Sequence, residues 1–324
     1  MASSVSTTDI PTKKLGIPQA SVQGFTFADF LLLVCVSIWA LNVPLIKSIL
    51  QYLNPLAVSI LRFTVAGLIM FAIFLYRERS LRIQLKHLPL MILCALCGIT
   101  LNQVVFVYAL SNTSASEVSL LMATTPTFAV LIAWMLKQEK TTASYWKSLP
   151  ISLAGVVLIV LTAPGAHLSG GWFGDFLAIL TAFSWAAYTV ILRPLMRHYS
   201  ITKLGAYITL MGTVMLLPFG LPQINIDAIT NLPAIIWVEL IYATLGAVVL
   251  TNILWYFGVK RLGGPRTAFY SYLQPFLGVV AAALVLSEQI VIWQLLGGIL
   301  IILGMLIYRR VLSFSRIRKL ILRS

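Results

Sequence analysis

Residues 37–47 read "SIWALNVPLIK", an apolar stretch in which Lys47 follows Trp39 by eight residues. Residues 183–193 read "FSWAAYTVILR" and have the same spacing between Trp185 and Arg193. Each of these two residues is separated from its counterpart by 146 positions. Similarity at one long offset indicates an internal repeat, so we expect one structural unit to occur twice in the chain.

The repeat extends along both halves of the chain, at offsets of 148 or 149. The matched pairs are Gly98 and Gly246, Tyr108 and Tyr256, Pro126 and Pro275, Glu139 and Glu288, and Gly155 and Gly304. Glycine and proline act on the backbone in ways that other residues do not, so their recurrence indicates a similar chain path in both halves.

The chain of 324 residues is far more apolar than a soluble protein. Hydrophobic residues make up 60% of it and charged residues 10%, whereas soluble domains have about 25% charged residues. A helix needs roughly 20 mainly apolar residues to cross a bilayer. Apolar runs predict ten spans, at 28–48, 55–76, 88–110, 115–136, 146–163, 175–193, 203–220, 233–258, 266–286 and 290–308.

Ten spans in two repeats place five spans in each unit. Because five is odd, the second unit must enter the membrane in the opposite direction to the first. The predicted fold is an all-α membrane protein, with ten transmembrane helices arranged as two inverted five-helix repeats. The expected divisions are an N-terminal tail (1–27), a first repeat (28–163), a second repeat (164–308) and a basic C-terminal tail (309–324).

The positive charges lie on one side of this scheme. Of the 23 Lys and Arg residues, 21 fall in the tails and the loops of one side, and Lys47 and Arg62 lie at or within spans. Cytoplasmic loops collect Lys and Arg, so we expect a multi-pass protein of the cell membrane with both termini in the cytoplasm. The net charge of +14 then reflects topology and a basic tail near lipid headgroups, and we expect no nucleic-acid partner.

Four ionisable residues fall in or near the outer third of the predicted spans. They are Lys47, Arg62, Glu117 and Glu239. A lone charge in a bilayer is costly, so two cations and two anions at similar depth can offset one another. One interpretation is static pairing or extension toward the headgroups, and the other is an outer gate in which Arg62 exchanges partners between states.

Side-chain amides lie nearer the middle of spans one, three, eight and nine. They are Asn42, Asn102, Gln103, Asn252 and Gln274. An amide in hydrocarbon needs hydrogen-bond partners, so each must face another helix or a wet cavity. Together they predict a polar substrate cavity, with aromatic residues as candidates for its walls. These aromatic residues are Trp39, Tyr108, Trp185, Tyr188, Tyr256, Tyr270 and Tyr272, and each can equally anchor a helix at the membrane interface.

Three prolines and two stripes of small residues suggest how the helices bend and pack. Pro44, Pro126 and Pro275 fall inside spans, where proline bends a helix, and we expect them to act as hinges. Small residues seven positions apart, Ser148 with Gly155 and Gly297 with Gly304, mark spans five and ten. Such stripes allow close helix packing, either within the chain or in a homodimer.

Residues 37–47, "NPLAVSILRFTVAGL" at 54–68 and two longer segments give the chain a resemblance to a known family. The longer segments are "LNQVVFVYALSNTSASEVSLLMATTPTFAVLIAWMLKQE" and "LTNILWYFGVKRLGGPRTAFYSYLQPFLGVVAAALVLSE". The sequence resembles EamA-type members of the drug/metabolite transporter superfamily over roughly residues 28–308. This resemblance implies secondary transport, often the efflux of amino acids or other small metabolites. Arg62 departs from the symmetry, because no cation lies near Ile208 in the second repeat.

Inverted repeats suit a carrier, because its outward-open and inward-open states become near mirror images around a central site. An amide and aromatic lining suits a zwitterionic solute, so the predicted function is amino acid export by alternating access. The alternative is a carrier or exchanger of anionic or phosphorylated metabolites held by Lys47 and Arg62. A membrane enzyme or a channel would be a different class. Cys94 and Cys97 stand alone and no phosphate-binding loop occurs, so we expect no catalytic residue, metal or cofactor.

Overall fold

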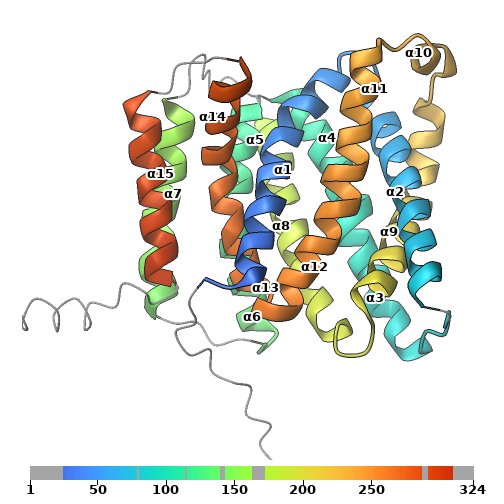
Figure 1. Cartoon of the computed structure of the whole chain (residues 1–324), viewed down its shortest axis with the longest axis horizontal. Coiled ribbons are helices and arrows are strands. Elements are labelled where there is room, and N and C mark those ends of the chain that lie inside the picture. The colour runs from blue at the N-terminus through green and yellow to red at the C-terminus, as the bar shows by residue number, and fades with distance from the viewer. Residues whose placement is uncertain are drawn as a thin grey trace, which may run out of the picture.

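A computed structural model of the chain describes residues 25–78, 80–113, 115–138, 143–162, 172–286 and 291–308. Within these residues every regular element is a helix (Figure 1). In the same part of the chain, eight helical stretches are long and apolar enough to cross a membrane. The prediction of an all-α membrane protein is therefore confirmed. Residues 1–24 and 309–324, Glu139, Glu288 and the side chain of Glu117 lie outside the described residues.

The two halves follow the same order of spans, and the second half contains two additional short elements, α10 and η5. The first half has α1 (Phe27–Ile49), α2 (Pro55–Arg77), η1 (Leu85–His87), α3 (Leu88–Ala95), η2 (Leu96–Leu101), α4 (Asn102–Asn112), α5 (Ala115–Met122), α6 (Thr125–Met135) and α7 (Ala143–Leu161). The second half has α8 (Trp172–Leu195), α9 (Ile201–Gly220), η3 (Leu221–Gln223), α10 (Ile226–Thr230), α11 (Ala234–Ile241), η4 (Tyr242–Leu250), α12 (Thr251–Leu262), α13 (Gly264–Ala268), η5 (Phe269–Tyr272), α14 (Leu273–Leu286) and α15 (Ile292–Tyr308). The shorter α14 and α15 occupy the predicted ninth and tenth spans and run alongside the others (Figure 1).

Equivalent spans of the two halves pack on each other. Helix α2 packs against α9, and α7 packs against α15, while α1 packs against α12 and α14 and α4 packs against α8. Figure 1 shows α7 and α15 side by side at one edge of the bundle. The two halves thus share a core instead of forming separate units, so any cavity between them is lined by both.

The stripes of small residues in spans five and ten face each other within the chain. A Cβ atom added to Gly155 would lie 2.5 Å from the Gly297 carbonyl oxygen, and one added to Gly304 would meet the Ser152 hydroxyl at 2.0 Å. Glycine allows this close approach of two backbones. A homodimer that uses spans five and ten remains a prediction, and it would have to form through the other faces of α7 and α15.

Spans three, four, eight and nine are irregular at matching places. The third and eighth spans change from α-helix to π-helix, in η2 and η4. The fourth span is interrupted at residues 123–124, and the ninth passes through the 3-10 segment η5. Pro126 and Pro275 lie in the first turn of the helices that follow these interruptions, where a missing backbone N–H costs little. Pro44, in contrast, lies inside the continuous α1. Their role as hinges remains a prediction.

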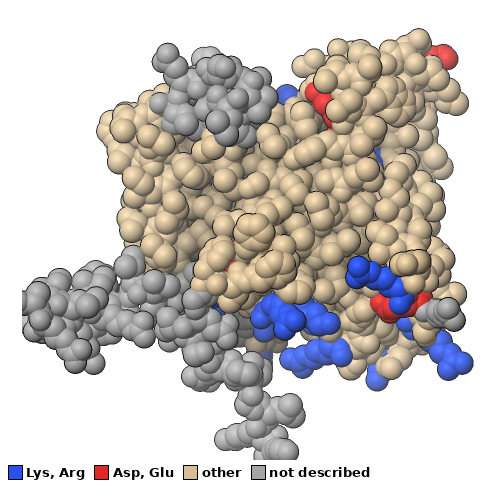
Figure 2. All heavy atoms as spheres, viewed as in Figure 1, with Lys and Arg blue, Asp and Glu red and all other residues tan. Residues whose placement is uncertain are grey.

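One end of the bundle is basic. Figure 2 shows Lys and Arg side chains gathered at the end where α1 begins, below a broad band of uncharged residues. Residues of this end include Arg82, Arg197, Lys203, Lys260 and Arg266. We call it the inner end and the opposite one the outer end.

Candidate functional site

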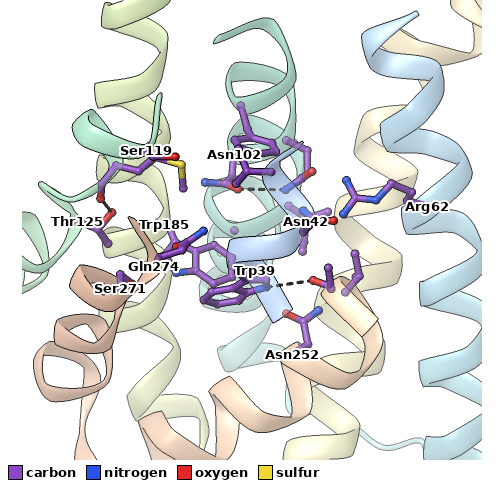
Figure 3. A pocket seen from close by; sticks show the side chains of 18 of the residues that line it. Trp39, Asn42, Arg62, Asn102, Ser119, Thr125, Trp185, Asn252, Ser271 and Gln274 are labelled. Atoms are coloured by element: carbon purple, nitrogen blue, oxygen red, sulfur yellow. Dashed lines mark hydrogen bonds between the residues drawn. The ribbon is translucent and has the colours of Figure 1, made fainter. Parts of the chain in front are cut away.

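A cavity lies between the two halves and is lined by both of them (Figure 3). The space around it that atoms do not fill is about 890 Å³, and part of this space is open to the surroundings. The lining residues are Trp39, Asn42, Val43, Arg62, Phe63, Gly98, Ile99, Asn102, Gln103, Phe106, Ser119, Met122, Ala123, Thr125, Trp185, Ala247, Val248, Asn252, Ser271, Gln274 and Pro275. All five amides named from the sequence are among them.

The irregular segments supply much of this lining. Gly98 and Ile99 belong to η2, and Ala247 and Val248 belong to η4. Ala123 lies at the interruption of the fourth span. Because π-helical turns and breaks interrupt the regular backbone hydrogen bonding, membrane proteins tolerate them where they line a cavity. The same feature in both repeats therefore places the cavity at their interface.

Arg62 is the cation of this lining. Its side chain is 3% exposed, and its Nε and Nη2 groups donate to the Ala243 carbonyl oxygen at 3.3 and 3.1 Å. Nη1 is buried and has no hydrogen-bond partner among the described residues. Figure 3 shows the guanidinium group directed toward Asn42. Part of a buried cation is thus available to a ligand.

The amides are only partly satisfied by the protein. Asn102 Nδ2 donates to the Thr181 carbonyl oxygen at 3.1 Å and to Ser184 Oγ at 3.0 Å, and this ties α4 to α8. Gln103 Nε2 donates to Asn102 Oδ1 at 3.2 Å. Three other amide atoms are buried without a partner in the described structure: Asn42 Oδ1, Gln103 Oε1 and Asn252 Nδ2. An unpaired buried polar group costs about 1–3 kcal/mol, so a ligand that forms a hydrogen bond with one of these atoms gains binding free energy.

Two tryptophans line the cavity, Trp39 and Trp185, and a third, Trp255, is buried behind them. The Trp39 ring lies 5.3 Å from that of Trp185 and 4.9 Å from that of Trp255. Trp39 Nε1 donates to the Ala247 carbonyl oxygen at 3.1 Å and to Thr251 Oγ1 at 3.0 Å. These bonds hold the indole in place, so the wall is both apolar and fixed.

Seven of the residues predicted for substrate binding or gating lie outside the lining. Lys47 Nζ donates to the backbone carbonyls of Leu110 and Thr113, the latter at 3.2 Å, and the Tyr108 hydroxyl accepts from Gln223 Nε2 at 3.0 Å. Tyr188 and Tyr256 are fully buried and hydrogen-bond each other. The remaining three are Tyr270, which donates to Asp29, and Glu239 and Tyr272, whose Oε2 atom and hydroxyl group are buried without a partner in the described structure. The side chain of Glu117 lies outside the described residues.

Other lining residues were not identified from the sequence. Ser119, Thr125 and Ser271 add hydroxyl groups, and Phe63, Phe106 and Met122 add apolar surface. Thr125 directly precedes Pro126, so the matched prolines were a usable signal for it, whereas Ser271 lies four residues before Pro275. No comparable pattern marked the apolar ones. The described residues contain no group of three His, Cys, Asp or Glu side chains that could hold a metal ion.

Comparisons with known proteins agree with this architecture. A model of the EamA-like transporter family matches residues 26–161 and again residues 172–310. An uncharacterized transporter of Archaeoglobus fulgidus is 31% identical over 85% of this chain and 94% of its own length. A probable terminal-alkyne amino-acid exporter of Streptantibioticus cattleyicolor is 28% identical over 89% of this chain and 96% of its own. A probable amino-acid metabolite efflux pump of Salmonella typhimurium is 26% identical over 90% and 96%.

The fold is also similar to that of solved structures. One crystal structure superimposes with a TM-score of 0.70 at 20% identity, covering 88% of this chain and 99% of the other. At that identity the similarity concerns the fold alone. Both family matches together span most of the chain, one in each half.

Proposed function

The chain belongs to the EamA-like transporter family, and on this premise we propose that it exports neutral amino acids through the cavity between its repeats. Membership of a transporter family makes it a multi-pass secondary transporter of a small molecule, and not an enzyme. The export of amino acids is the more specific part of the proposal. It is supported by two relatives whose names include an amino-acid exporter and an amino-acid metabolite efflux pump.

The observation that carries this proposal is the set of unpaired polar atoms around one cavity. Arg62 Nη1 and Asn252 Nδ2 are donors without partners in the described structure, and Asn42 Oδ1 and Gln103 Oε1 are acceptors without partners. A zwitterionic amino acid has a carboxylate for such donors and an ammonium group for such acceptors. Hydrogen bonds that involve a charged group are the stronger ones, so both ends of the substrate contribute to binding.

The apolar part of the lining favours a neutral side chain on the substrate. Trp39, Trp185, Phe63, Phe106 and Met122 all contact the cavity. Small-molecule sites combine such apolar walls with a few polar groups that fix orientation. A charged substrate side chain would find no opposite charge other than Arg62 among these lining residues.

A phosphorylated substrate is the weaker candidate. It carries about two negative charges, and Arg62 is the one Lys or Arg among the described lining residues. Lys47, the second cation of that alternative, is directed instead to the carbonyls of Leu110 and Thr113. The geometry therefore matches a single carboxylate better than a phosphate.

We place the inner end in the cytoplasm, as the positive-inside rule suggests. The Lys and Arg residues gather there (Figure 2), and both termini belong to that side in the predicted topology. Export then means uptake at the inner end and release at the outer end.

Counterflow in liposomes tests the proposed substrate. Purified protein is reconstituted into liposomes loaded with unlabelled leucine, and labelled leucine is supplied outside. We expect transient, saturable accumulation of label above that in unloaded liposomes, since a carrier exchanges its substrate across the membrane. Liposomes loaded with glucose 6-phosphate and supplied with the labelled form are the comparison. Counterflow of the sugar phosphate without counterflow of any neutral amino acid would reverse the assignment.

A further inference from the structure

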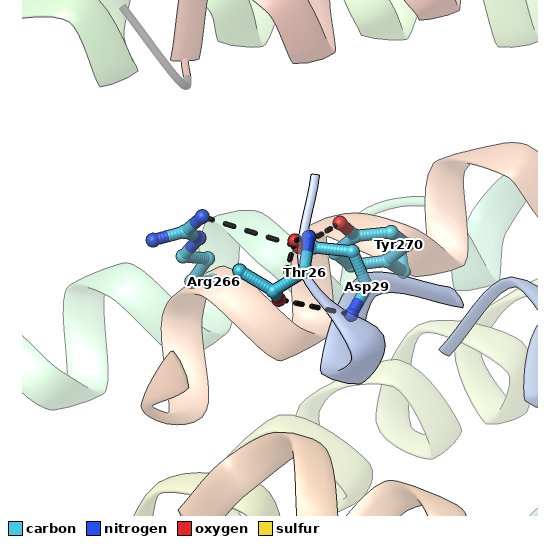
Figure 4. A network of polar contacts seen from close by, with 4 residues as sticks. All are labelled: Thr26, Asp29, Arg266 and Tyr270. Carbon is cyan, nitrogen blue, oxygen red and sulfur yellow. Dashed lines mark hydrogen bonds and ion pairs between the residues drawn. The ribbon is translucent and has the colours of Figure 1, made fainter. Parts of the chain in front are cut away.

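A buried carboxylate at the start of α1 ties the two halves together at the inner end (Figure 4). Asp29 is 0% exposed. Its Oδ1 atom accepts a hydrogen bond from the Tyr270 hydroxyl and lies 4.0 Å from Arg266 Nη2. Its Oδ2 atom accepts from the backbone N and the Oγ1 of Thr26, both at 2.7 Å. One oxygen thus caps α1, and the other reaches the second repeat.

One partner of Asp29, Tyr270, lies on a segment that lines the cavity. Tyr270 is in η5, directly before Ser271 and four residues before Gln274, and both of these face the cavity. On the other side of the contact, Trp39 lies ten residues after Asp29 in the same helix, which is about 15 Å along it. The contact therefore joins, at the inner end, two segments that form the site.

The inner end is packed closed around this contact. Five aromatic side chains of α8, α12 and η5, which connect the cavity to the inner end, are fully buried, namely Tyr188, Trp255, Tyr256, Phe269 and Tyr272. Helix α1 packs against both η5 and α14 there. A path from the cavity to the inner end therefore requires α1 and η5 to separate, which breaks the bond between Asp29 and Tyr270.

No equivalent contact occurs among the described residues of the outer end. The counterpart of Asp29 is Asp175, 146 positions later, in the first turn of α8. The counterparts of Tyr270 and Arg266, 149 positions earlier, are Leu121 and Glu117. A leucine donates no hydrogen bond, and a glutamate has the same charge as Asp175. Accordingly, Asp175 Oδ1 has no hydrogen-bond partner among the described residues, although α5 packs against α8.

We propose that Asp29, Tyr270 and Arg266 form a latch that holds the inner end closed, and that the absence of an equivalent contact among the described residues of the outer end makes the inward-closed state the resting state of this carrier. These are positioning residues, since none of them lines the cavity. The proposal rests on the proposed function only in that the chain alternates between two states. A substrate that contacts Ser271 and Gln274 acts on the segment that carries Tyr270, so binding and unlatching involve the same piece of chain.

The test measures access to the cavity from each side without any substrate. Met122, a lining residue, is replaced by cysteine, and a membrane-impermeant maleimide is applied to vesicles of known sidedness. The chain without this cysteine gives the background from Cys35, Cys94 and Cys97. Tyr270→Phe keeps the buried ring and removes the hydroxyl. We expect it to raise labelling from the inner end about tenfold, the change in population that the loss of one hydrogen bond to a charged group produces.

Tyr272→Phe is the matched control, because Tyr272 is equally buried in η5 and its hydroxyl has no hydrogen-bond partner in the described structure. We expect no change of labelling for it. Equal labelling of the two folded variants would overturn the latch. If Tyr270→Phe is not monodisperse, Arg266→Gln replaces it in the same experiment. We expect labelling from the inner end to rise about threefold, because this variant removes a partly exposed ion pair. Unchanged labelling would count against the proposal. Because no substrate is used, failure of leucine counterflow leaves this result intact.

Discussion

Replacement of Arg62 by glutamine is expected to reduce transport by about 100-fold, because the substrate carboxylate loses its cation inside a buried site. The side chain is 3% exposed, and Nη1 has no other partner in the described structure. Glutamine keeps a polar group of similar length but cannot supply the charge. The measurement is the initial rate of leucine counterflow at subsaturating substrate, normalised to the amount of reconstituted protein.

Two further variants separate charge from geometry and from expression. Arg62→Lys keeps the charge and loses the planar fork that bonds the Ala243 carbonyl, so we expect an intermediate loss of about tenfold. Arg77→Gln removes an exposed arginine from the last turn of the same helix and should leave transport unchanged. Near-normal transport by a well-folded Arg62→Gln variant would disprove both carboxylate binding and the predicted outer gate at this residue.

Two glycines at equivalent positions of the repeats are expected to respond differently to alanine. A Cβ atom on Gly98 would lie 2.5 Å from ring atoms of Tyr188, which is fully buried and hydrogen-bonded to Tyr256. Since the ring has no room to move, overpacking should destabilise the protein by about 1–3 kcal/mol. We expect the thermal unfolding midpoint in detergent to fall by about 2–8 °C.

Gly246 is the built-in control for this experiment. A Cβ atom there would meet its nearest neighbour, Ile38 Cγ2, at 3.6 Å, an ordinary contact distance. Gly246→Ala should therefore leave the midpoint unchanged or raise it, because alanine favours a helix by up to about 1 kcal/mol. Similar midpoints for the two alanine variants would show that the contact between η2 and α8 is looser than described.

The membrane class, the repeats and the positions of the spans followed from the sequence alone. Apolarity summed over about 20 residues is a strong signal, because the bilayer rejects a polar segment wherever its side chains point. The pairs Trp39 with Trp185 and Pro126 with Pro275 also occupy equivalent positions of the two repeats. Both tryptophans line the cavity, and both prolines lie in the first turn of helices that begin beside it. The amides, for their part, were recognisable as residues that hydrocarbon does not tolerate unpaired.

The tertiary structure decided which of the candidates meet. Trp185 lines the cavity, whereas Tyr188, three residues later, is buried against Tyr256, and no feature of the sequence separates them. In a soluble helix, a polar stripe marks the face turned to water, but in a bilayer both the lipid-facing and the packed faces are apolar. The rotation of each helix therefore depends on its neighbours. For the same reason the π-helical segments η2 and η4, and the contacts of Asp29 with the second repeat, could only be found once the two repeats were packed together.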